Sequence, residues 1–225
     1  IEKPANVTVV DLDALSNNIG KYNWFDYSSY FLNKAAVRLE YMPEYVMCFV
    51  RQIKALMGNT KKCLVLDLDN TLWGGVVGDE GWQDIQVDPN NAVGEAYRFF
   101  QAYCLALRKR GVILAVCSKN DELIAKEPFE KNENMILRLK DISCFIANWE
   151  NKADNLQKIA SELNIGIDSL VFFDDNPAER EIVKQFVPEV HVIDVPEDPA
   201  LYVLQMEKEQ PFEWLQITKE DLERT

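Results

Sequence analysis

The chain has 225 residues, and 48% of them are hydrophobic, which is typical of a globular protein with a sizeable core. Its formal net charge of −13 argues against sequence-independent binding to nucleic acid or to an anionic membrane surface. No apolar run approaches the roughly 20 residues that a membrane helix needs, and no signal peptide is visible. We therefore expect neither nucleic acid nor a membrane as a partner.

The first sixty residues differ in pattern from the rest of the chain. Residues 4–17 predict a strand and a turn, and residues 33–58 have a helical pattern around Pro43. This region contains no histidine and no glycine-rich phosphate loop, so we expect it to add no catalytic group. From this different pattern, we interpret residues 1–60 as the tail of a preceding domain or as an N-terminal extension packed on the α/β core. The chain begins with Ile1 rather than Met, so we expect that an upstream part is missing.

From Lys61 onward, strand-like segments alternate with helix-like segments. The strands are predicted at residues 62–67, 112–117, 141–147, 169–173 and 191–195, and the helices at residues 94–110, at 151–166 and from Pro177. This alternation predicts parallel βαβ units, and the continuous apolar strands predict a sheet that is covered on both faces. We therefore predict a doubly wound, Rossmann-like α/β domain over residues 61–207, followed by an acidic tail over residues 208–225.

Polar side chains that carry chemistry stand where several of these elements begin or end. They are Asp67, Asp69 and Thr71 after the first strand, Ser118 after the second, Lys152 in the helix after the third, and Asp174 and Asp175 after the fourth. In doubly wound sheets, ligands bind beyond the carboxyl ends of the strands. We therefore expect these groups to converge at one edge of the sheet.

Together these residue types indicate phosphoryl transfer assisted by a metal ion. Two acids at the end of a buried strand are costly unless a cation compensates them, and Mg²⁺ prefers oxygen ligands. One carboxylate can attack phosphorus while a second moves a proton, and a hydroxyl and an ammonium can hold the phosphoryl oxygens. Each feature alone has a structural explanation, because Ser118 and the later acids can cap helices and Lys152 can be a surface charge.

Cysteine and histidine usage limits the other kinds of site. The five cysteines are odd in number and form no CxxC pair, so neither a disulfide framework nor a zinc site is indicated, and we expect a reducing, cytoplasmic location. His191 is the only histidine, which excludes Ser-His-Asp and Cys-His catalysis.

The strings LDLDNT, CS and FFDDN, together with Lys152, resemble the four motifs of the haloacid dehalogenase (HAD) superfamily. The resemblance implies that Asp67 is the nucleophile and Asp69 the general acid/base, and that Ser118 and Lys152 bind phosphate, a role we also assign to Thr71. It further implies that Mg²⁺ is held by Asp67, by the backbone carbonyl of Asp69 and by one of two later acids. Of these two, Asp174 and Asp175, the second is the expected direct ligand.

Longer strings, including LDLDNTLWGGVVGDEG and NKADNLQKIASELNIGIDSLVFFDDNPAERE, are similar to the FkbH-like branch of that superfamily. This similarity implies transfer of a glyceryl unit from 1,3-bisphosphoglycerate to an acyl carrier protein, with removal of phosphate. It also implies that residues 1–60 are the tail of an SGNH-hydrolase-like domain. Two alternatives stay open: a Mg²⁺-dependent phosphatase for a small phosphomonoester or phosphoprotein, and a non-catalytic binding module.

Two further expectations concern access to the site and acyl transfer. About twenty residues separate Thr71 from the helix near Gly94, enough for a flap hairpin but too few for a cap domain, so we expect an open site. Acyl transfer requires a nucleophile that attacks carbon, which is either the thiol of the carrier or an enzyme cysteine. Cys117, beside Ser118, is the best-placed enzyme cysteine, although strand alternation favours a packing role for it.

Overall fold

The computed structural model describes residues 9–58 and 60–212, which form two compact units divided between Thr60 and Lys61. The first unit contains helices α1 (Leu12–Ile19), α2 (Lys21–Trp24), α3 (Tyr27–Asn33) and α4 (Met42–Leu56). Pro43 stands in the first turn of α4, so the predicted helix there is confirmed.

The strand and turn predicted over residues 4–17 are wrong for the part that the structure describes. The Asp11 side chain accepts a hydrogen bond from Ala14 N at 2.9 Å and so caps α1, which begins at Leu12. Residues 4–8 lie outside the described part of the chain. The predicted acidic tail lies outside it from residue 213 onward.

The second unit is built on a five-stranded parallel sheet in the order β3-β2-β1-β4-β5. Its strands are β1 (Cys63–Leu66), β2 (Ile113–Ser118), β3 (Cys144–Ala147), β4 (Leu170–Phe173) and β5 (His191–Val192). This arrangement confirms the predicted α/β class and the predicted order of strands along the chain. The third strand starts later than predicted, because Asp141 accepts a hydrogen bond from Arg138 N at 3.0 Å and closes a turn of 3₁₀ helix over Leu139–Asp141.

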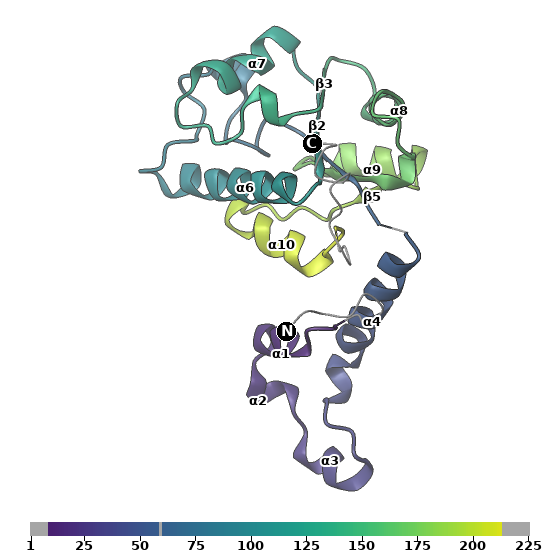
Figure 1. Ribbon diagram of the computed structural model, residues 1–225. Coiled ribbons are helices and arrows are strands. Elements are labelled where there is room, and N and C mark those ends of the chain that lie inside the picture. The colour runs from purple at the N-terminus through teal and green to yellow at the C-terminus, as the bar shows by residue number, and fades with distance from the viewer. Residues whose placement is uncertain (1–8, 59, 213–225) are drawn as a thin grey trace. The chain divides into compact units, whose positions relative to one another are not determined.

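Helices cover both faces of the sheet (Figure 1). Side chains of β1 alternate between the faces, with Leu64 and Leu66 in one buried cluster and Cys63 and Val65 in the other. The first cluster includes residues of α6 (Ala92–Lys109), α7 (Glu122–Lys131) and α10 (Tyr202–Glu209), and the second includes residues of α8 (Lys152–Glu162) and α9 (Pro177–Phe186). None of the described helices has the length and apolar character required to span a membrane.

The segment between β1 and α6 forms a short flap. It contains one turn of helix, α5 (Val77–Glu80), and an antiparallel bridge between Gly74 and Gln86. The structure describes every residue from Thr71 to Ala92, and no cap domain lies among them. The predicted flap without a cap is therefore confirmed.

The loop that follows β1 is anchored by two tyrosines. Asn70 has φ of 54°, in the left-handed region that few residues other than glycine adopt. Its carbonyl oxygen accepts hydrogen bonds from Tyr202 Oη at 2.9 Å and from Tyr97 Oη at 3.4 Å. Tyr202 also packs edge-on against Phe173 of β4, with 5.1 Å between the ring centroids. The loop geometry thus depends on residues far away in the sequence.

A close backbone approach explains Gly94 in the first turn of α6. A Cβ atom at this position would lie 2.6 Å from Asp88 N and closer still to Asp88 O. We expect Gly94→Ala to lower the free energy of unfolding by a few kcal/mol, although alanine normally favours a helix by about 1 kcal/mol. Chemical denaturation measures this change. Gly78→Ala is the matched control, because its added Cβ would meet only Asn120 Oδ1 at 3.7 Å, and an equal loss in both variants would contradict the steric explanation.

Candidate active site

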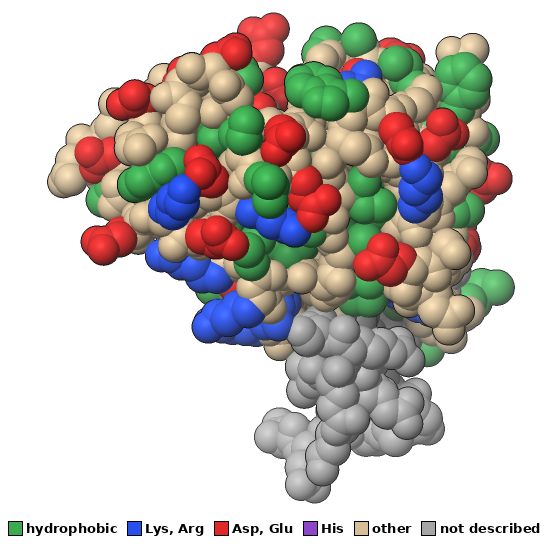
Figure 2. All heavy atoms as spheres, turned by 90° about the horizontal axis from the view of Figure 1, so that it is seen from above, with side chains coloured by type: hydrophobic (Ala, Val, Ile, Leu, Met, Phe, Trp, Pro, Cys, Tyr) green, Lys and Arg blue, Asp and Glu red, His purple; other side chains and the backbone are tan. Residues whose placement is uncertain are grey.

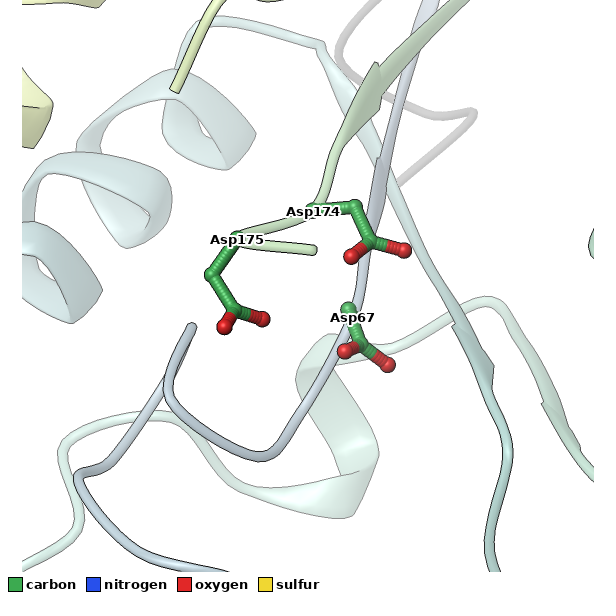
Figure 3. A group of neighbouring side chains, drawn as sticks. All are labelled: Asp67, Asp174 and Asp175. Carbon is green, nitrogen blue, oxygen red and sulfur yellow. The ribbon is translucent and has the colours of Figure 1, made fainter. Parts of the chain in front are cut away.

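Three carboxylates meet where β1 and β4 end. Asp67 directly follows β1, and its N–H donates to Phe173 O at 3.0 Å, while Asp174 and Asp175 directly follow β4. One carboxylate oxygen from each residue lies within 4.8 Å of the others, and the three carboxylates are neighbours at the ends of the two strands (Figure 3). Since β1 has β2 on one side and β4 on the other, this cluster lies where ligands bind in doubly wound sheets.

Lys152 bridges two of the three carboxylates. It is the first residue of α8 and is only 3% exposed, and its Nζ lies 2.6 Å from Asp174 Oδ2 and 3.0 Å from Asp67 Oδ1. Asn151 positions the ammonium by capping α8, since its side chain accepts a hydrogen bond from Ala153 N at 2.8 Å. A buried ammonium is stabilised by such neighbours, and their charges raise the pKa of Lys152 against the opposing effect of burial.

One carboxylate oxygen of Asp67 accepts no hydrogen bond in the described part of the chain, although it is ion-paired with Lys152. Its Oδ1 is buried and accepts no hydrogen bond from the described residues, because Lys152 Nζ approaches it without hydrogen-bond geometry. The ion pair with Lys152 offsets part of the cost of burying this oxygen, but a buried carboxylate oxygen that accepts no hydrogen bond keeps the rest of its desolvation penalty. This set of carboxylate oxygens, which includes a buried Asp67 oxygen that accepts no hydrogen bond within the described ranges, fits a hard divalent cation.

The charges of the cluster are also unbalanced. When all four side chains are ionised, the three carboxylates face the single ammonium of Lys152, which leaves two negative charges. Burial, followed by the charge of Asp67, raises the pKa of both Asp174 and Asp175. A bound divalent cation would remove this excess of negative charge.

Asp174 and Asp175 differ in how many of their oxygens are already used. Asp174 Oδ2 accepts from Lys152 Nζ, and its Oδ1 accepts from Asn176 N at 2.9 Å. Asp175 Oδ1 accepts from Thr71 Oγ1 at 3.4 Å, the one hydrogen bond to this carboxylate among the described residues. Asp175 therefore has more acceptor capacity for a metal ion than Asp174, in line with its predicted role as a direct ligand.

Both carboxylate oxygens of Asp69 are hydrogen-bonded to groups outside the carboxylate cluster. Its Oδ1 accepts from Trp73 Nε1 and from Val77 N, each at 2.9 Å, and its Oδ2 accepts from Asn120 Nδ2 at 3.0 Å. Burial raises the pKa of Asp69, while the hydrogen bonds from the flap act against that rise. Its predicted contribution to the metal site is through the backbone carbonyl and stays a prediction.

The two predicted hydroxyl groups lie at the same edge of the sheet. Thr71 is fully buried, and its Oγ1 both donates to Asp175 Oδ1 and accepts from Asp175 N at 3.3 Å. Ser118 is 2% exposed and ends β2, the strand that pairs with β1 on the side opposite to β4. Their roles in binding phosphate stay predictions.

No protein-family model matches the chain, and no curated protein sequence matches it. Among solved structures, the chain is similar to the N-terminal part of the protein BF1531 from Bacteroides fragilis, described as containing a phosphatase domain and complexed with Mg. The TM-score is 0.89 at 47% sequence identity, over 92% of this chain. The two chains share one fold. Since the match covers 55% of the solved chain, the present chain spans about half of its length.

The structure also places four residues beside the predicted site residues that the sequence did not single out. Asn120 contacts Asp69, as described above, and lies in the string CSKND, where an amide two residues after Ser118 was the available signal. Arg180 Nη1 donates to the carbonyl oxygens of Asp174 and Asp175, both at 2.8 Å, and Glu179 forms an ion pair with Lys119 at 2.6 Å. No sequence signal shows that Arg180, on a charged helix, turns inward to this loop.

Cys117 is packed in the core. It is fully buried in the cluster beneath α8 and α9, and its Sγ lies 3.9 Å from the carbonyl oxygen of Lys152, to which it donates. Burial raises the pKa of Cys117 to about 12. A thiol with a raised pKa is a poor nucleophile at neutral pH, so this environment favours the packing role over the acyl-acceptor role.

We expect Cys117 to resist alkylation in the folded protein. Because the thiolate forms only as the pH approaches about 12, iodoacetamide at pH 7–8 should leave this residue unmodified over the time in which it modifies the half-buried Cys48. Peptide mass mapping after a timed exposure measures both sites. Rapid modification of Cys117 at pH 7 in the folded protein would show that its thiol is accessible and activated.

Proposed function

We propose that the chain is a Mg²⁺-dependent phosphatase of the HAD superfamily with Asp67 as its nucleophile. The observation that carries the proposal is the carboxylate cluster, in which Asp67 Oδ1 is buried beside Asp174 and Asp175 and accepts no hydrogen bond from the described residues. The similarity to a Mg-complexed structure with a phosphatase domain supports the metal and the class of reaction. The four HAD-like motifs support the choice of nucleophile.

In this proposal, Asp67, Asp175 and the backbone carbonyl of Asp69 hold Mg²⁺. When bound, the ion screens the repulsion between the carboxylates and the phosphoryl group and stabilises the charge that develops on the phosphoryl oxygens. Asp174 does not need to contact the ion. Its hydrogen bonds with Lys152 and Asn176 suit it instead to holding the ammonium in place.

We assign the nucleophile, the general acid/base and the phosphate-binding groups of phosphoryl transfer to the following side chains. Asp67 attacks phosphorus to form an aspartyl phosphate, and Asp69 protonates the leaving group and later deprotonates the attacking water. Lys152, Thr71 and Ser118 bind the phosphoryl oxygens. Lys152 is the strongest of these groups, because its buried ammonium already lies 3.0 Å from the proposed nucleophile.

Release of phosphate from p-nitrophenyl phosphate tests this function. We expect turnover with Mg²⁺ and none after EDTA treatment, with recovery when Mg²⁺ is added back. Inactivity of the folded protein toward a panel of phosphomonoesters in the presence of Mg²⁺ would instead favour a non-catalytic binding module.

A second candidate function is FkbH-like transfer of a glyceryl unit from 1,3-bisphosphoglycerate to an acyl carrier protein. The absence of a cap domain among residues 71–92 favours it, because a cap domain there would stand between the site and a macromolecular partner. The environment of Cys117 favours direct attack by the carrier's pantetheine thiol rather than a thioester on the enzyme. Incubation with 1,3-bisphosphoglycerate and a pantetheinylated carrier, read by intact mass, separates the two functions.

The surface charge does not identify a docking site for such a carrier. Acidic, basic and hydrophobic side chains are interspersed on the face shown in Figure 2. The basic run of Arg108, Lys109 and Arg110 ends α6, just before the amino end of β2, and thus lies at the edge of the sheet opposite to the site. Arg108 also pairs with Asp141, with 3.6 Å between Nη1 and Oδ1. We therefore assign this run to the end of the helix rather than to carrier docking.

A further inference from the structure

The hydrogen bonds around Asp69 leave one oxygen of its carboxylate available for chemistry. Each carboxylate oxygen offers two lone pairs. In the described part of the chain, Oδ1 accepts two hydrogen bonds, from Trp73 Nε1 and Val77 N, so both of its lone pairs are engaged. Oδ2 accepts one hydrogen bond, from Asn120 Nδ2, and keeps one lone pair. A proton carried by Asp69 without the loss of a hydrogen bond therefore sits on Oδ2.

Asn120 is itself held in a defined orientation. It is 4% exposed, and its Oδ1 accepts from Asp121 N at 3.0 Å, which turns the amide nitrogen toward Asp69. Because Asn120 follows the end of β2, its contact with Asp69 links the ends of two paired strands. The other two donors, Trp73 and Val77, belong to the flap. Asp69 is thus fixed from the flap on one side and from the sheet on the other.

We propose that Asn120 is a positioning residue that orients Asp69 so that proton transfer occurs through Oδ2; this inference rests on the proposed phosphatase function. As Asp67 forms its bond to phosphorus, the bond from phosphorus to the leaving oxygen breaks, and that oxygen takes the electron pair and the proton of Oδ2. Water then attacks the aspartyl phosphate and gives a proton back to Oδ2. The bond from phosphorus to Asp67 breaks, which restores the carboxylate and releases phosphate.

A comparison of leaving groups tests this role. p-Nitrophenolate departs without a proton, whereas an alkoxide leaving group needs one. In Asn120→Ala, we expect single-turnover release of alcohol from an alkyl phosphate to slow by about 10- to 100-fold. Release of p-nitrophenol should slow by less than about 3-fold, and KM should change little for either substrate. Asn120→Leu roughly keeps the volume of the side chain and should show the same larger loss for the alkyl phosphate than for the aryl phosphate. This variant takes the place of Asn120→Ala if Asn120→Ala folds poorly.

Asn132→Ala is the matched control. Asn132 is also a buried amide, 7% exposed, and its Nδ2 donates to Trp82 O at 3.0 Å, so it anchors the far part of the flap without contacting Asp69. We expect this variant to keep the wild-type ratio between the two leaving groups.

Three results would overturn the role of Asn120. The first is an equal loss for both leaving groups in the Asn120 variants, the second is no loss for either, and the third is the same selective loss in Asn132→Ala. Inactivity of the wild-type protein toward both substrates would overturn the phosphatase function itself, and the inference with it.

Discussion

Asp67→Asn is expected to lower kcat for an aryl phosphate by about 10⁴-fold or more, because the amide cannot form the aspartyl phosphate intermediate. The fold should survive this change. Replacing one of three clustered carboxylates with a neutral group removes like-charge repulsion in the metal-free protein, so the melting temperature should stay constant or rise. Steady-state kinetics and a thermal melt without Mg²⁺ measure the two effects.

Asp154→Asn is the matched control for this experiment. Asp154 is exposed in the first turn of α8, two residues from Lys152. The substitution removes one negative charge, as Asp67→Asn does, but outside the carboxylate cluster. We expect it to retain wild-type activity. Acid quenching followed by mass spectrometry should detect a phosphorylated peptide that contains Asp67 in the wild type and none in Asp67→Asn. Near-normal turnover by the folded Asp67→Asn protein would refute the assignment of the nucleophile.

Lys152→Met should damage both activity and stability. Removing the ammonium leaves Asp67 and Asp174 buried without their partner, a change that typically costs about 3–5 kcal/mol of folding free energy. Activity should fall by at least about 100-fold, since the same ammonium is proposed to stabilise the phosphoryl group. Urea denaturation and steady-state kinetics measure the two losses.

A second substitution separates these two roles of Lys152. In Lys152→Met combined with Asp174→Asn, one uncompensated carboxylate is removed, so we expect much of the lost stability to return while activity stays low. The single variant Asp174→Asn is also measured, because the double-mutant cycle compares the stability of the wild type, both single variants and the double variant. If the double variant is no more stable than Lys152→Met, the ion pair is not the source of the stability loss.

The order of the strands explains why so much of the site was predictable from the sequence. In a parallel sheet, every strand ends at the same edge, so the positions of Asp67, Ser118 and Asp174 after apolar runs were enough to place them at one edge. Strand alternation likewise favoured a packing role for Cys117, and the structure buries this residue between the sheet and the helices.

Side-chain direction and local competition account for what the sequence analysis missed. The preference of Arg180 for the carbonyl oxygens of the Asp174 loop depends on how α9 is rotated, which helical spacing alone does not specify. Near the N-terminus, residues 4–17 suggested a strand and a turn, but Asp11 caps a helix that begins at Leu12. The contact between Asn120 and Asp69 could not be read from the sequence, because an amide in a loop usually serves a turn.

The anchoring of Asn70 by Tyr202 bears on how the domain can be cut from a longer protein. The hydroxyl of Tyr202 donates a hydrogen bond to the carbonyl oxygen of Asn70, which lies between the proposed nucleophile Asp67 and Thr71. The two bonded residues are 132 positions apart in the sequence. A fragment trimmed after β5 would keep all the residues proposed to react, yet it would lack the group that supports the left-handed turn at Asn70. The smallest fragment that keeps this support therefore extends at least through Tyr202, the first residue of α10.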